Sequence, residues 1–535
     1  MIPVSFIKKR MTGKIQKTIC IMLCAMLCLS GCRTGRKANA SVDDKYRTTY
    51  EIFVGSFCDS NGDGTGDLNG IRSKLDYIEA LGFNALWLTP VHPSATYHKY
   101  DVDDYYAIDP AFGTMEDYEA FLKECHDRGI KVYLDLVLNH TSDEHEWFRA
   151  ASDYLHELPA GWEPDPSYCR YFDYYNFTSQ PTDGYTHLEG TGWYYESRFW
   201  SEMPDLNLNS DAVKDEIRSI MAFWLGKGVD GFRLDAVTSY FQDDQTANTE
   251  FIRFLTEAAH SIDTDCYLVG EAWTDRDTIT GLYSSGIDSL FNFPFAGRDG
   301  LIAKTLNGTY SASYYVKNMV QAEKAYADAA PGCVDAPFYT NHDMDRSAEY
   351  YPDDSGPVTK MAYAMSLLMT GNSFVYYGEE IGMNGSGRDE NRRAPMYWSN
   401  EASDPDICTG PPYTDEVRMK FPSLADQMKD EGSLYNWFKE VIRIRNEYPA
   451  IARGVTENAL FLSDEKTAAF FRRSDTDDDL LIVMNLSSRT EEKNLKKAGK
   501  GFKLKEVLAA NGESIKYKGS TLNLPAYSIV IFTVE

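Results

Sequence analysis

The sequence has little that points to nucleic acid, metal clusters or a disulfide scaffold. Its 535 residues carry 53 Lys and Arg against 81 Asp and Glu, a formal net charge of −28. This charge disfavours nucleic acids and anionic membrane surfaces as partners and leaves the binding of a neutral ligand unaffected. Ten cysteines are present, and four of them fall within the first 32 residues. The other six are scattered without metal-like spacing, and we expect no required disulfide.

The apolar stretch near the N-terminus, Ile19 to Leu29, is too short for the roughly 20 residues that a membrane-spanning helix needs. Basic residues precede it, as in a secretory signal peptide. It ends in Leu-Ser-Gly-Cys32, which resembles the bacterial lipobox. This resemblance implies a lipoprotein signal peptide over 1–32, a lipid on Cys32, a polar linker over 33–45, and an exported protein anchored to the outer surface of the cell membrane. The alternative is a plain secretory peptide with an incidental cysteine.

Most of the chain alternates between strand and helix patterns. The expected strands are Tyr50 to Val54, Asn84 to Leu88, Ile130 to Asn139, Val229 to Val237, Cys266 to Trp273, Ile287 to Phe293, Ala336 to Asn341 and Phe374 to Tyr377. The expected helices include Ile71 to Leu81, Tyr118 to Arg128 and Leu434 to Asn446. This alternation of strands and helices predicts the α/β class and a TIM (β/α)8 barrel over 46–140 and 205–448.

Two regions depart from that alternation. Residues 141–204 are rich in Tyr, Trp, Pro and Asp, show no helical period and are too long for a plain loop, so we expect an inserted domain after the third strand. Beyond Pro449, short β-rich segments separated by turn residues predict a C-terminal antiparallel β-sandwich over 449–535.

Four motifs place charged side chains at the ends of expected strands. They are DLVLNH (Asp135 to His140), GFRLDAV (Gly231 to Val237), GEAW (Gly270 to Trp273) and NHD (Asn341 to Asp343). Parallel barrel strands deliver such residues to one open face at their carboxyl ends. A single motif of this kind is equally consistent with a structural ion pair, whereas four in the same register favour a catalytic site.

In their order and residue patterns these motifs resemble those of the α-amylase family, glycoside hydrolase family 13, and the resemblance covers roughly Tyr46 to Glu535. The resemblance implies that 141–204 is domain B and the sandwich domain C. It also implies that Asp235 is the nucleophile, Glu271 the general acid/base and Asp343 the carboxylate that braces the sugar in the transition state. The substrate-binding residues that it implies are Tyr100, Asp135, His140, Arg233, His342 and Arg393.

A retaining glycosidase needs one ionised carboxylate and one protonated carboxyl group about 5 Å apart. Arg233 and Asp235 are two residues apart and therefore share one side of a strand. The positive charge of Arg233 favours an ionised Asp235, while Glu271, less solvated and beside other carboxylates, should keep its proton longer. For the two histidines, the alternative is that they are ordinary core residues.

The segment DSNGDGTGD places oxygen-bearing side chains at alternate positions with glycines between them. Hard oxygen ligands at this spacing suit Ca²⁺, and bacterial relatives carry a calcium loop after the first barrel strand. The expected ligands are Asp59, Asn61, Asp63, the backbone oxygen of Thr65, and Asp67. The family resemblance adds Asn139, which matches a second calcium position of animal and fungal α-amylases. An EF-hand would need Glu where Gly70 stands, and the remaining alternative is a solvated acidic turn.

Specificity rests on fewer signals. MPDLN (Met203 to Asn207) resembles the group intermediate between oligo-1,6-glucosidases and neopullulanases, and Arg393 in RAPMYW matches the oligo-1,6-glucosidase side. Ala236 stands where relatives that prefer α-1,6 bonds tend to have Val, which favours α-1,4 bonds. Thr238-Ser239 replaces a Lys-His pair of many α-amylases, which leaves binding on the leaving-group side open.

We therefore expect a monomeric, retaining, endo-acting α-amylase that cuts α-1,4 bonds in starch and maltodextrins, with Ca²⁺ as its cofactor. The alternative enzymes are an α-glucosidase and a cyclomaltodextrinase-like hydrolase or transglycosylase. A non-catalytic glycan-binding protein is a third possibility. The intact set Asp235, Glu271 and Asp343 argues against it, because binding alone requires no proton donor opposite a nucleophile.

Overall fold

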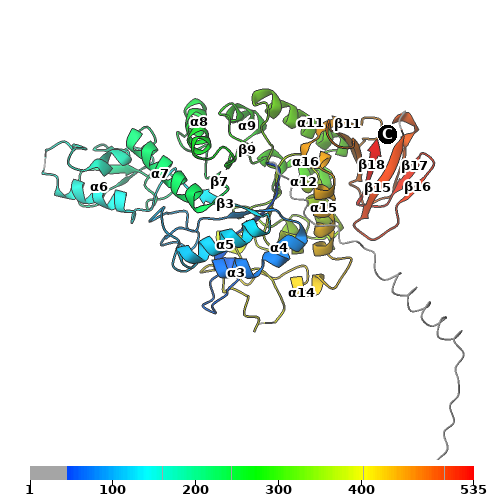
Figure 1. Cartoon of the computed structure of the whole chain (residues 1–535), viewed down its shortest axis with the longest axis horizontal. Coiled ribbons are helices and arrows are strands. Elements are labelled where there is room, and N and C mark those ends of the chain that lie inside the picture. The colour runs from blue at the N-terminus through cyan, green and yellow to red at the C-terminus, as the bar shows by residue number, and fades with distance from the viewer. Residues whose placement is uncertain (1–44, 160, 243, 402, 499–500, 535) are drawn as a thin grey trace, which may run out of the picture. The chain divides into compact units, whose positions relative to one another are not determined.

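The computed structural model describes residues 45–159, 161–242, 244–401, 403–498 and 501–534 (Figure 1). The expected signal peptide, Cys32 and all but the last residue of the expected linker lie outside the described residues. Within the described chain, no helix is both long and apolar enough to cross a membrane.

A ring of parallel strands forms the centre of the fold. Seven strands hydrogen-bond in the order β10-β1-β2-β3-β7-β8-β9. Their bounds are β1 Thr48–Ile52, β2 Ala85–Leu88, β3 Lys131–Leu136, β7 Gly231–Leu234, β8 Tyr267–Gly270, β9 Ser289–Leu290 and β10 Ser373–Tyr376. The parallel bridges Phe291–Ala336 and Phe338–Phe374 join an eighth segment to β9 and to β10. The ring is thereby closed, which confirms the (β/α)8 barrel, although the expected strand from Ala336 to Asn341 pairs only at these two points.

Large apolar side chains fill the inside of the barrel. Trp87, Phe291 and Phe374 belong to one buried cluster together with Tyr133, Tyr267 and Phe338. The Phe291 ring centroid lies 5.4 Å from that of Trp87 and 4.8 Å from that of Phe374. Because alternate residues of a strand point to the same side, each barrel strand supplies residues to this interior and to the helix-covered exterior.

Helices cover the outside of the ring. The longer ones are α4 Leu75–Leu81, α5 Met115–Asp127, α7 Asp211–Lys227, α8 Gln245–Ile262, α9 Arg276–Tyr283, α11 Ala312–Ala329, α12 Pro357–Leu367 and α15 Leu434–Glu447. The shorter ones are α2 Val54–Phe57, α3 Leu68–Ser73, α10 Leu301–Leu306, α13 Asp389–Arg392, α14 Leu424–Gln427, α16 Ala450–Arg453, η2 Phe293–Phe295, η3 Ser347–Glu349 and η4 Glu379–Ile381. The expected single helix from Ile71 to Leu81 is divided at Lys74, where the backbone leaves helical geometry (φ −102°, ψ 6°).

The inserted region contains a helix that the sequence interpretation missed. Helix α6, Glu146–Glu157, buries Trp147, Phe148, Ala151 and Leu155. These positions form one face of an amphipathic helix, so the expectation of no helical period in this region was wrong. The rest of the insertion comprises η1 Arg170–Tyr174 and the small antiparallel sheet β4 Phe177–Thr178, β6 Tyr194–Glu196 and β5 Tyr185–His187.

The C-terminal part is a β-sandwich, as expected. One sheet contains β11 Val455–Asn458, β12 Thr467–Arg473, β13 Leu480–Asn485, β18 Ser528–Val534 and β15 Phe502–Ala509, in that order. The other contains β14 Glu491–Asn494, β17 Thr521–Leu524 and β16 Lys516–Lys518, while η5 spans Leu495–Ala498. Leu481 and Phe532 of the first sheet share a buried cluster with Leu522 and Leu524 of the second, so the two sheets pack face to face.

Two buried arginines bond the end of α12, one from the barrel helix α15 and one from the C-terminal sandwich. Arg445 of α15 donates to the carbonyl oxygens of Leu367 (2.6 Å) and Met369 (2.7 Å). Arg472 of β12 donates to the carbonyl oxygen of Leu368 (2.6 Å) and to the hydroxyl of Thr456. The last carbonyl groups of a helix have no partner within the helix, so these guanidinium groups satisfy oxygens that would otherwise be buried without a donor.

We predict that Arg472→Met lowers the free energy of unfolding by about 2 kcal/mol or more, because the Leu368 carbonyl and the Thr456 hydroxyl lose a buried donor. Arg473→Met is the matched control, since the Arg473 side chain is 28% exposed and pairs with Glu457 and Asp479 at the surface. Denaturant melts of both variants provide the measurement. Equal losses for the two substitutions would contradict this role of Arg472.

Candidate active site

The three residues expected to be catalytic, and two expected to bind substrate, meet at the carboxyl ends of the barrel strands. Asp135 lies near the end of β3, Asp235 directly follows β7 and Glu271 directly follows β8. His342 and Asp343 follow the eighth segment of the ring. All five are at least two-thirds buried, and His342 is fully buried. The structure therefore brings together the side chains of all four sequence motifs.

Arg233 occupies the centre of this group. Its Nη1 lies 2.6 Å from Asp235 Oδ1 and 2.8 Å from Asp135 Oδ1, and its Nη2 lies 2.8 Å from Glu271 Oε2. Asp135 and Arg233 are directly paired across β3 and β7, so the sheet register itself sets the first contact. The guanidinium is fully buried and sits 5.1 Å from the centre of the Trp87 ring. One cation thus holds three carboxyl groups from neighbouring strand ends.

Glu271 lies in an environment that favours its protonated form. Burial raises the pKa of this carboxyl group to about 7, and the nearby carboxylates of Asp235 and Asp343 add to the rise against the opposing charge of Arg233. The backbone N–H of Ala236 donates to Glu271 Oε2 at 3.0 Å. Ala236 has a φ of 46°, an uncommon backbone conformation for a residue with a side chain. Strained positions of this kind cluster at functional sites, and here the strain aims an N–H group at Glu271.

Asp343 has the opposite electrostatic setting. Its Oδ2 lies 3.1 Å from His342 Nε2 and its Oδ1 lies 2.6 Å from Arg393 Nη2. Burial alone would raise the pKa of Asp343, but the charges of His342, Arg393 and Arg233 hold it below its usual range. For His342, burial alone would lower the pKa. The neighbouring carboxylates of Asp343 and Glu51 outweigh it and raise the pKa of the imidazole to about 10. At neutral pH the site therefore contains an ionised Asp343 and a Glu271 that readily holds a proton.

Tyr100 and His140 form one side of the site. The Tyr100 hydroxyl lies 2.9 Å from Asp135 Oδ2 and 2.6 Å from His342 Nε2, and its ring stacks on the His342 ring at 5.5 Å. His140 Nε2 lies 3.2 Å from the carbonyl oxygen of Tyr100. Burial lowers the pKa of His140, so this imidazole is neutral near pH 7. Every expected substrate-binding residue is thus part of the cluster or, for His140, adjoins it through Tyr100.

Glu51 and Trp87 are site residues that sequence reasoning missed. Glu51 Oε1 lies 2.6 Å from His342 Nδ1, and the Trp87 indole N–H donates to Asp135 Oδ2 at 3.2 Å. Both side chains are buried on barrel strands. A carboxylate within the otherwise apolar expected strand from Tyr50 to Val54 was the available signal for Glu51. The indole of Trp87 gave no such signal, because a buried strand tryptophan is ordinary core composition.

Arg393 is positioned by two further residues that were not predicted. It forms an ion pair with Asp389 at the start of α13, and its Nη1 donates to the Tyr97 hydroxyl at 3.0 Å. The Tyr97 hydroxyl in turn donates to Asp389 Oδ2 at 2.8 Å. These contacts fix the guanidinium that faces Asp343.

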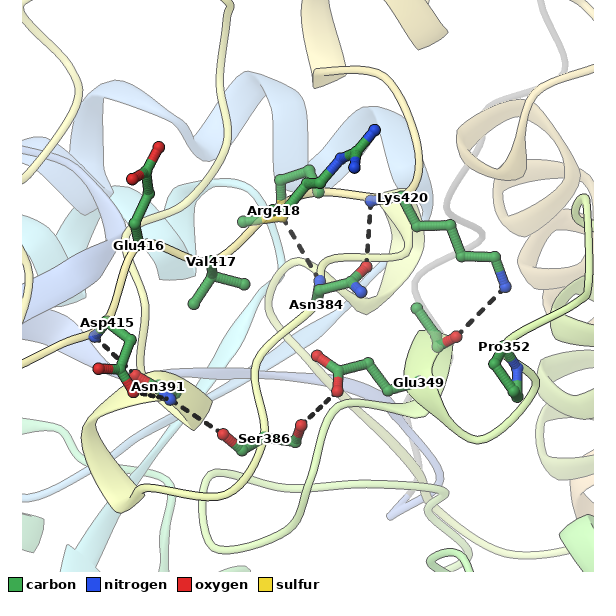
Figure 2. Close-up of a pocket in the computed structure, with 12 residues that line it drawn as sticks. Glu349, Pro352, Asn384, Ser386, Asn391, Asp415, Glu416, Val417, Arg418 and Lys420 are labelled. Carbon is green, nitrogen blue, oxygen red and sulfur yellow. Dashed lines mark hydrogen bonds between the residues drawn. The ribbon is translucent and has the colours of Figure 1, made fainter.

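A pocket behind α13 supports this arrangement (Figure 2). Asn391 and Asp415 form two reciprocal hydrogen bonds, at 2.9 and 2.8 Å, and Ser386 donates to Glu349. Asn384 accepts from the backbone of Lys420 at 3.2 Å. The polar groups of this pocket mainly bond one another, so its residues brace the loop that carries α13 and Arg393.

A second pocket of about 670 Å³ is lined partly by residues that follow Asp235 and Glu271 closely in the chain. Its walls include Phe199 of the insertion, Thr238 and Ser239 after β7, and Trp273 after β8. Phe199 and Trp273 are 51% and 54% exposed, so two aromatic faces are available to a ligand. The Thr238-Ser239 pair, which the sequence left without a clear binding role, therefore lines a ligand-sized space.

Gln242 ties this pocket to the inserted region. Its amide donates to Glu196 of β6 at 2.9 Å, and its backbone has a φ of 54°. Asn248 of α8 secures the same loop by donating to the carbonyl oxygens of Thr238 and Gln242, each at 3.0 Å. No local sequence signal predicts the Gln242 to Glu196 contact, because its partners lie 46 residues apart.

The acidic loop after β1 curls back on itself. Asp59 Oδ1 accepts from the N–H groups of Asn61 (3.0 Å) and Gly62 (2.7 Å), and its Oδ2 accepts from Gly64 (2.7 Å). Gly62 and Gly64 have φ of 83° and 92°, a region that favours glycine. Burial would raise the pKa of Asp59, but these backbone donors lower it.

The other expected metal ligands fall into two groups. Asp63 and Thr65 share the turn with Asp59, whereas Asp67 accepts from Gly70 (2.7 Å) and Ser60 (2.9 Å) and caps α3. Asn139 is separate from the loop and donates to Asp205 Oδ1 at 3.0 Å. Across the described residues, no three His, Cys, Asp or Glu side chains form a metal-binding group. A cation in the loop would therefore depend on the amide and backbone oxygens as well as on carboxylates.

Comparison with known proteins identifies the family. The family model "Alpha amylase, catalytic domain" matches residues 51–454, and "Alpha-amylase SusG C-terminal domain" matches residues 468–531. The chain belongs to the α-amylase family. It is a glycoside hydrolase, with the motif residues of that family gathered at the carboxyl ends of the barrel strands.

The relatives of this α-amylase family member carry more than one activity in their names. Alpha-amylase 3 of Dictyoglomus thermophilum is 37% identical over 449 residues, covering 82% of this chain and 84% of the relative. The structure of Eubacterium rectale Amy13B is 46% identical with a TM-score of 0.90, covering 92% and 96% of the two chains. An oligo-1,6-glucosidase of Heyndrickxia coagulans is 29% identical and covers 83% and 92%. Hydrolysis of glucosidic bonds is common to these names, and the bond type is not.

We predict that kcat/KM falls as the pH rises through about 7. The pKa of Glu271 is raised to about 7, and a general acid at this position loses its proton above that pKa. Initial rates on a maltooligosaccharide from pH 4 to 9 test this. A decline that begins near the ordinary Glu value of about 4.3 would contradict the assignment.

Proposed function

We propose that the protein is a retaining, endo-acting α-amylase that hydrolyses α-1,4-glucosidic bonds in starch and maltodextrins. The observation that carries this proposal is the position of Asp235 and Glu271 on the two amino nitrogens of Arg233. This arrangement favours the short separation of about 5 Å that retaining glycosidases use rather than the wider gap of inverting ones.

Each carboxyl group has a distinct step in this proposal. Asp235 attacks the anomeric carbon and forms a glycosyl ester while Glu271 gives its proton to the departing glucosidic oxygen. Glu271, now ionised, takes a proton from water, whose oxygen attacks the anomeric carbon and releases Asp235 as a carboxylate. Asp343, kept ionised by His342 and Arg393, binds sugar hydroxyls and stabilises the positive charge that develops on the ring.

The pocket lined by residues shortly after Asp235 and Glu271 in the chain supports action within a glucan chain. Phe199 and Trp273 offer aromatic faces to sugar rings, and Thr238 and Ser239 offer hydroxyl groups. We assign this pocket to the sugar units on the leaving-group side of the cut. The small side chain of Ala236 next to the nucleophile supports α-1,4 specificity, and the names of the α-amylase relatives support starch as the substrate class.

An α-glucosidase acting on short α-1,6-linked oligosaccharides is the second candidate. The ion pair between Arg393 and Asp343 favours it, because RAPMYW matches the oligo-1,6-glucosidase side of the family, and relatives with that name cover most of the chain. Product analysis separates the two. Early release of mixed maltooligosaccharides from amylose, with little action on isomaltose, supports the amylase, whereas glucose from isomaltose supports the glucosidase.

Asp235→Asn and Glu271→Gln should each reduce kcat by several orders of magnitude while leaving the fold intact, because the two residues act as one unit in catalysis. Asp335→Asn is the matched control: Asp335 is a partly buried carboxylate next to the barrel and accepts from Asn292 at 2.7 Å, away from the site residues. Steady-state rates on amylose provide the measurement. Near-parental activity in either site variant would overturn the assignment.

We also propose that the loop from Asp59 to Asp67 binds Ca²⁺. Hard oxygen donors of Asp59, Asn61, Asp63 and the Thr65 backbone, on a turn already curled by Gly62 and Gly64, fit this cation. The bound ion would tie the loop together and add stability. Asn139, which donates to Asp205 at 3.0 Å, is proposed for a second calcium position.

Removal of calcium should lower the melting temperature of the parent by mass action, and Asp63→Ala should abolish that dependence. Asp104→Ala, at an acidic turn outside the loop, is the control and should remain sensitive to chelator. Thermal melts with EDTA and with added Ca²⁺ test this. A parent whose melting temperature is the same under both conditions would remove calcium from the loop.

We propose that the protein is exported and anchored to the outer surface of the cell membrane through a lipid on Cys32. The lipobox-like sequence before Cys32 supports this, and two or three acyl chains give durable anchoring where one gives only marginal binding. Metabolic labelling with a fatty acid should mark the parent and not Cys32→Ser. Label on the Ser variant, or an unlipidated parent in the medium, would favour an ordinary secreted enzyme.

A further inference from the structure

A cavity of about 520 Å³ lies where the barrel meets the C-terminal sandwich, and the catalytic proposal makes no use of it. The barrel side is formed by the loop between α10 and α11, including Asn307 and Tyr310. The sandwich side is formed by Glu465, Ser488 and Tyr527, with their neighbours. We call this space the joint pocket.

The two walls of the joint pocket are fixed to each other. The N–H of Ala312 donates to the carbonyl oxygen of Glu465 at 2.9 Å, and the N–H of Ser313 donates to that of Asp464 at 2.8 Å. These backbone bonds connect the start of α11 directly to the turn before β12. The pocket is therefore formed in advance of any ligand, which reduces the entropy cost of binding.

Several polar side chains that line the joint pocket have no hydrogen-bond partner among the described residues. They are the hydroxyl groups of the partly buried Tyr310 and Tyr527 and the side chains of the solvent-exposed Ser488 and Glu465. The pocket in Figure 2 is different, because its Asn391, Asp415, Ser386 and Glu349 side chains bond one another. The joint pocket thus offers donors and acceptors that a ligand can satisfy.

Tyr527 is held in an unfavourable backbone conformation at the rim. Its φ is 49°, which is a genuine outlier for a bulky residue. The backbone keeps it there: its N–H donates to Ser487 at 3.1 Å, and its carbonyl oxygen accepts from Ala510 at 2.9 Å. Strain of this kind accompanies ligand clamps, and here it presents a half-buried aromatic ring beside the unused polar groups.

The chemistry of the joint pocket favours a neutral polyhydroxylated ligand. The tyrosine faces suit the C–H side of a sugar ring, and the free carboxylate and hydroxyl groups suit sugar hydroxyls. An anionic ligand is disfavoured, because the one lysine in the lining, Lys466, already pairs with Glu491 at 3.1 Å, and Glu465 carries a free negative charge.

We propose that the joint pocket is an accessory binding site for an α-glucan chain, separate from the catalytic cleft. The proposal rests on the proposed function, which supplies the polymer. A second contact on the same chain raises the effective concentration of substrate at the enzyme, so it benefits long glucans that reach both sites and gives no advantage on short ones.

The test measures binding without turnover, in a Glu271→Gln background, by retardation in native gels that contain amylopectin. Tyr310→Ala removes one ring, and Tyr527→Gly removes the other while suiting the positive φ. Ser488→Trp fills the pocket from an exposed position without removing any packing. Tyr168→Ala is the matched control, since Tyr168 is an 80% exposed tyrosine of the inserted region. We expect the three pocket variants to weaken amylopectin binding about threefold or more and the control to leave it unchanged.

Enzymes with Glu271 intact provide the second readout. The pocket variants should raise KM for amylopectin and leave kcat/KM for maltotriose unchanged. Unaltered gel retardation in both Tyr310→Ala and Ser488→Trp would overturn the accessory site, even if hydrolysis is normal. A parent that is retarded by amylopectin through the joint pocket but does not cut it would instead contradict the proposed function alone.

Discussion

The positive charge of Arg233, fully buried inside the barrel, is the constraint on which the rest of the site depends. Moving a guanidinium out of water costs several kcal/mol, and the cost is offset only where carboxylates and good geometry surround it. Asp135, Asp235 and Glu271 provide that surrounding, each within 2.8 Å of the guanidinium. Because these three residues stand on or directly after β3, β7 and β8, the parallel register of the barrel determines the geometry of the site.

Arg233 lies near both Glu271 and Asp343, yet the two carboxyl groups differ in protonation, because the other charged groups around them differ. Asp343 faces His342 and Arg393 and stays ionised, whereas burial and nearby carboxylates raise the pKa of Glu271 to about 7. Residues further out maintain this difference. Glu51 keeps a proton on His342, and Asp389 with Tyr97 fixes Arg393 against Asp343.

The features predicted from sequence are those whose signal is local. The strand and helix periods predicted the barrel and the sandwich, and four short motifs were sufficient to predict that Asp235, Glu271 and Asp343 converge. Helix α6 was missed because its apolar face, Trp147 to Leu155, lies in a stretch whose aromatic residues resemble those of an irregular loop.

Contacts between distant segments could not be predicted in this way. The bond from Gln242 to Glu196 and the packing of Arg472 against the end of α12 depend on tertiary neighbours that no local pattern identifies. The joint pocket belongs to the same class, since its two tyrosines come from positions 310 and 527 and meet only in the folded protein.

The most direct test of the central assignment is the site of covalent attachment during turnover. The Glu271→Gln enzyme can be loaded with an α-glucosyl fluoride, whose leaving group needs no proton, then digested and examined by mass spectrometry. If Asp235 is the nucleophile, one glucosyl unit will be found on the peptide that contains Asp235. Attachment to Asp343 or Asp135, or an unlabelled enzyme that still releases fluoride, would contradict the assignment.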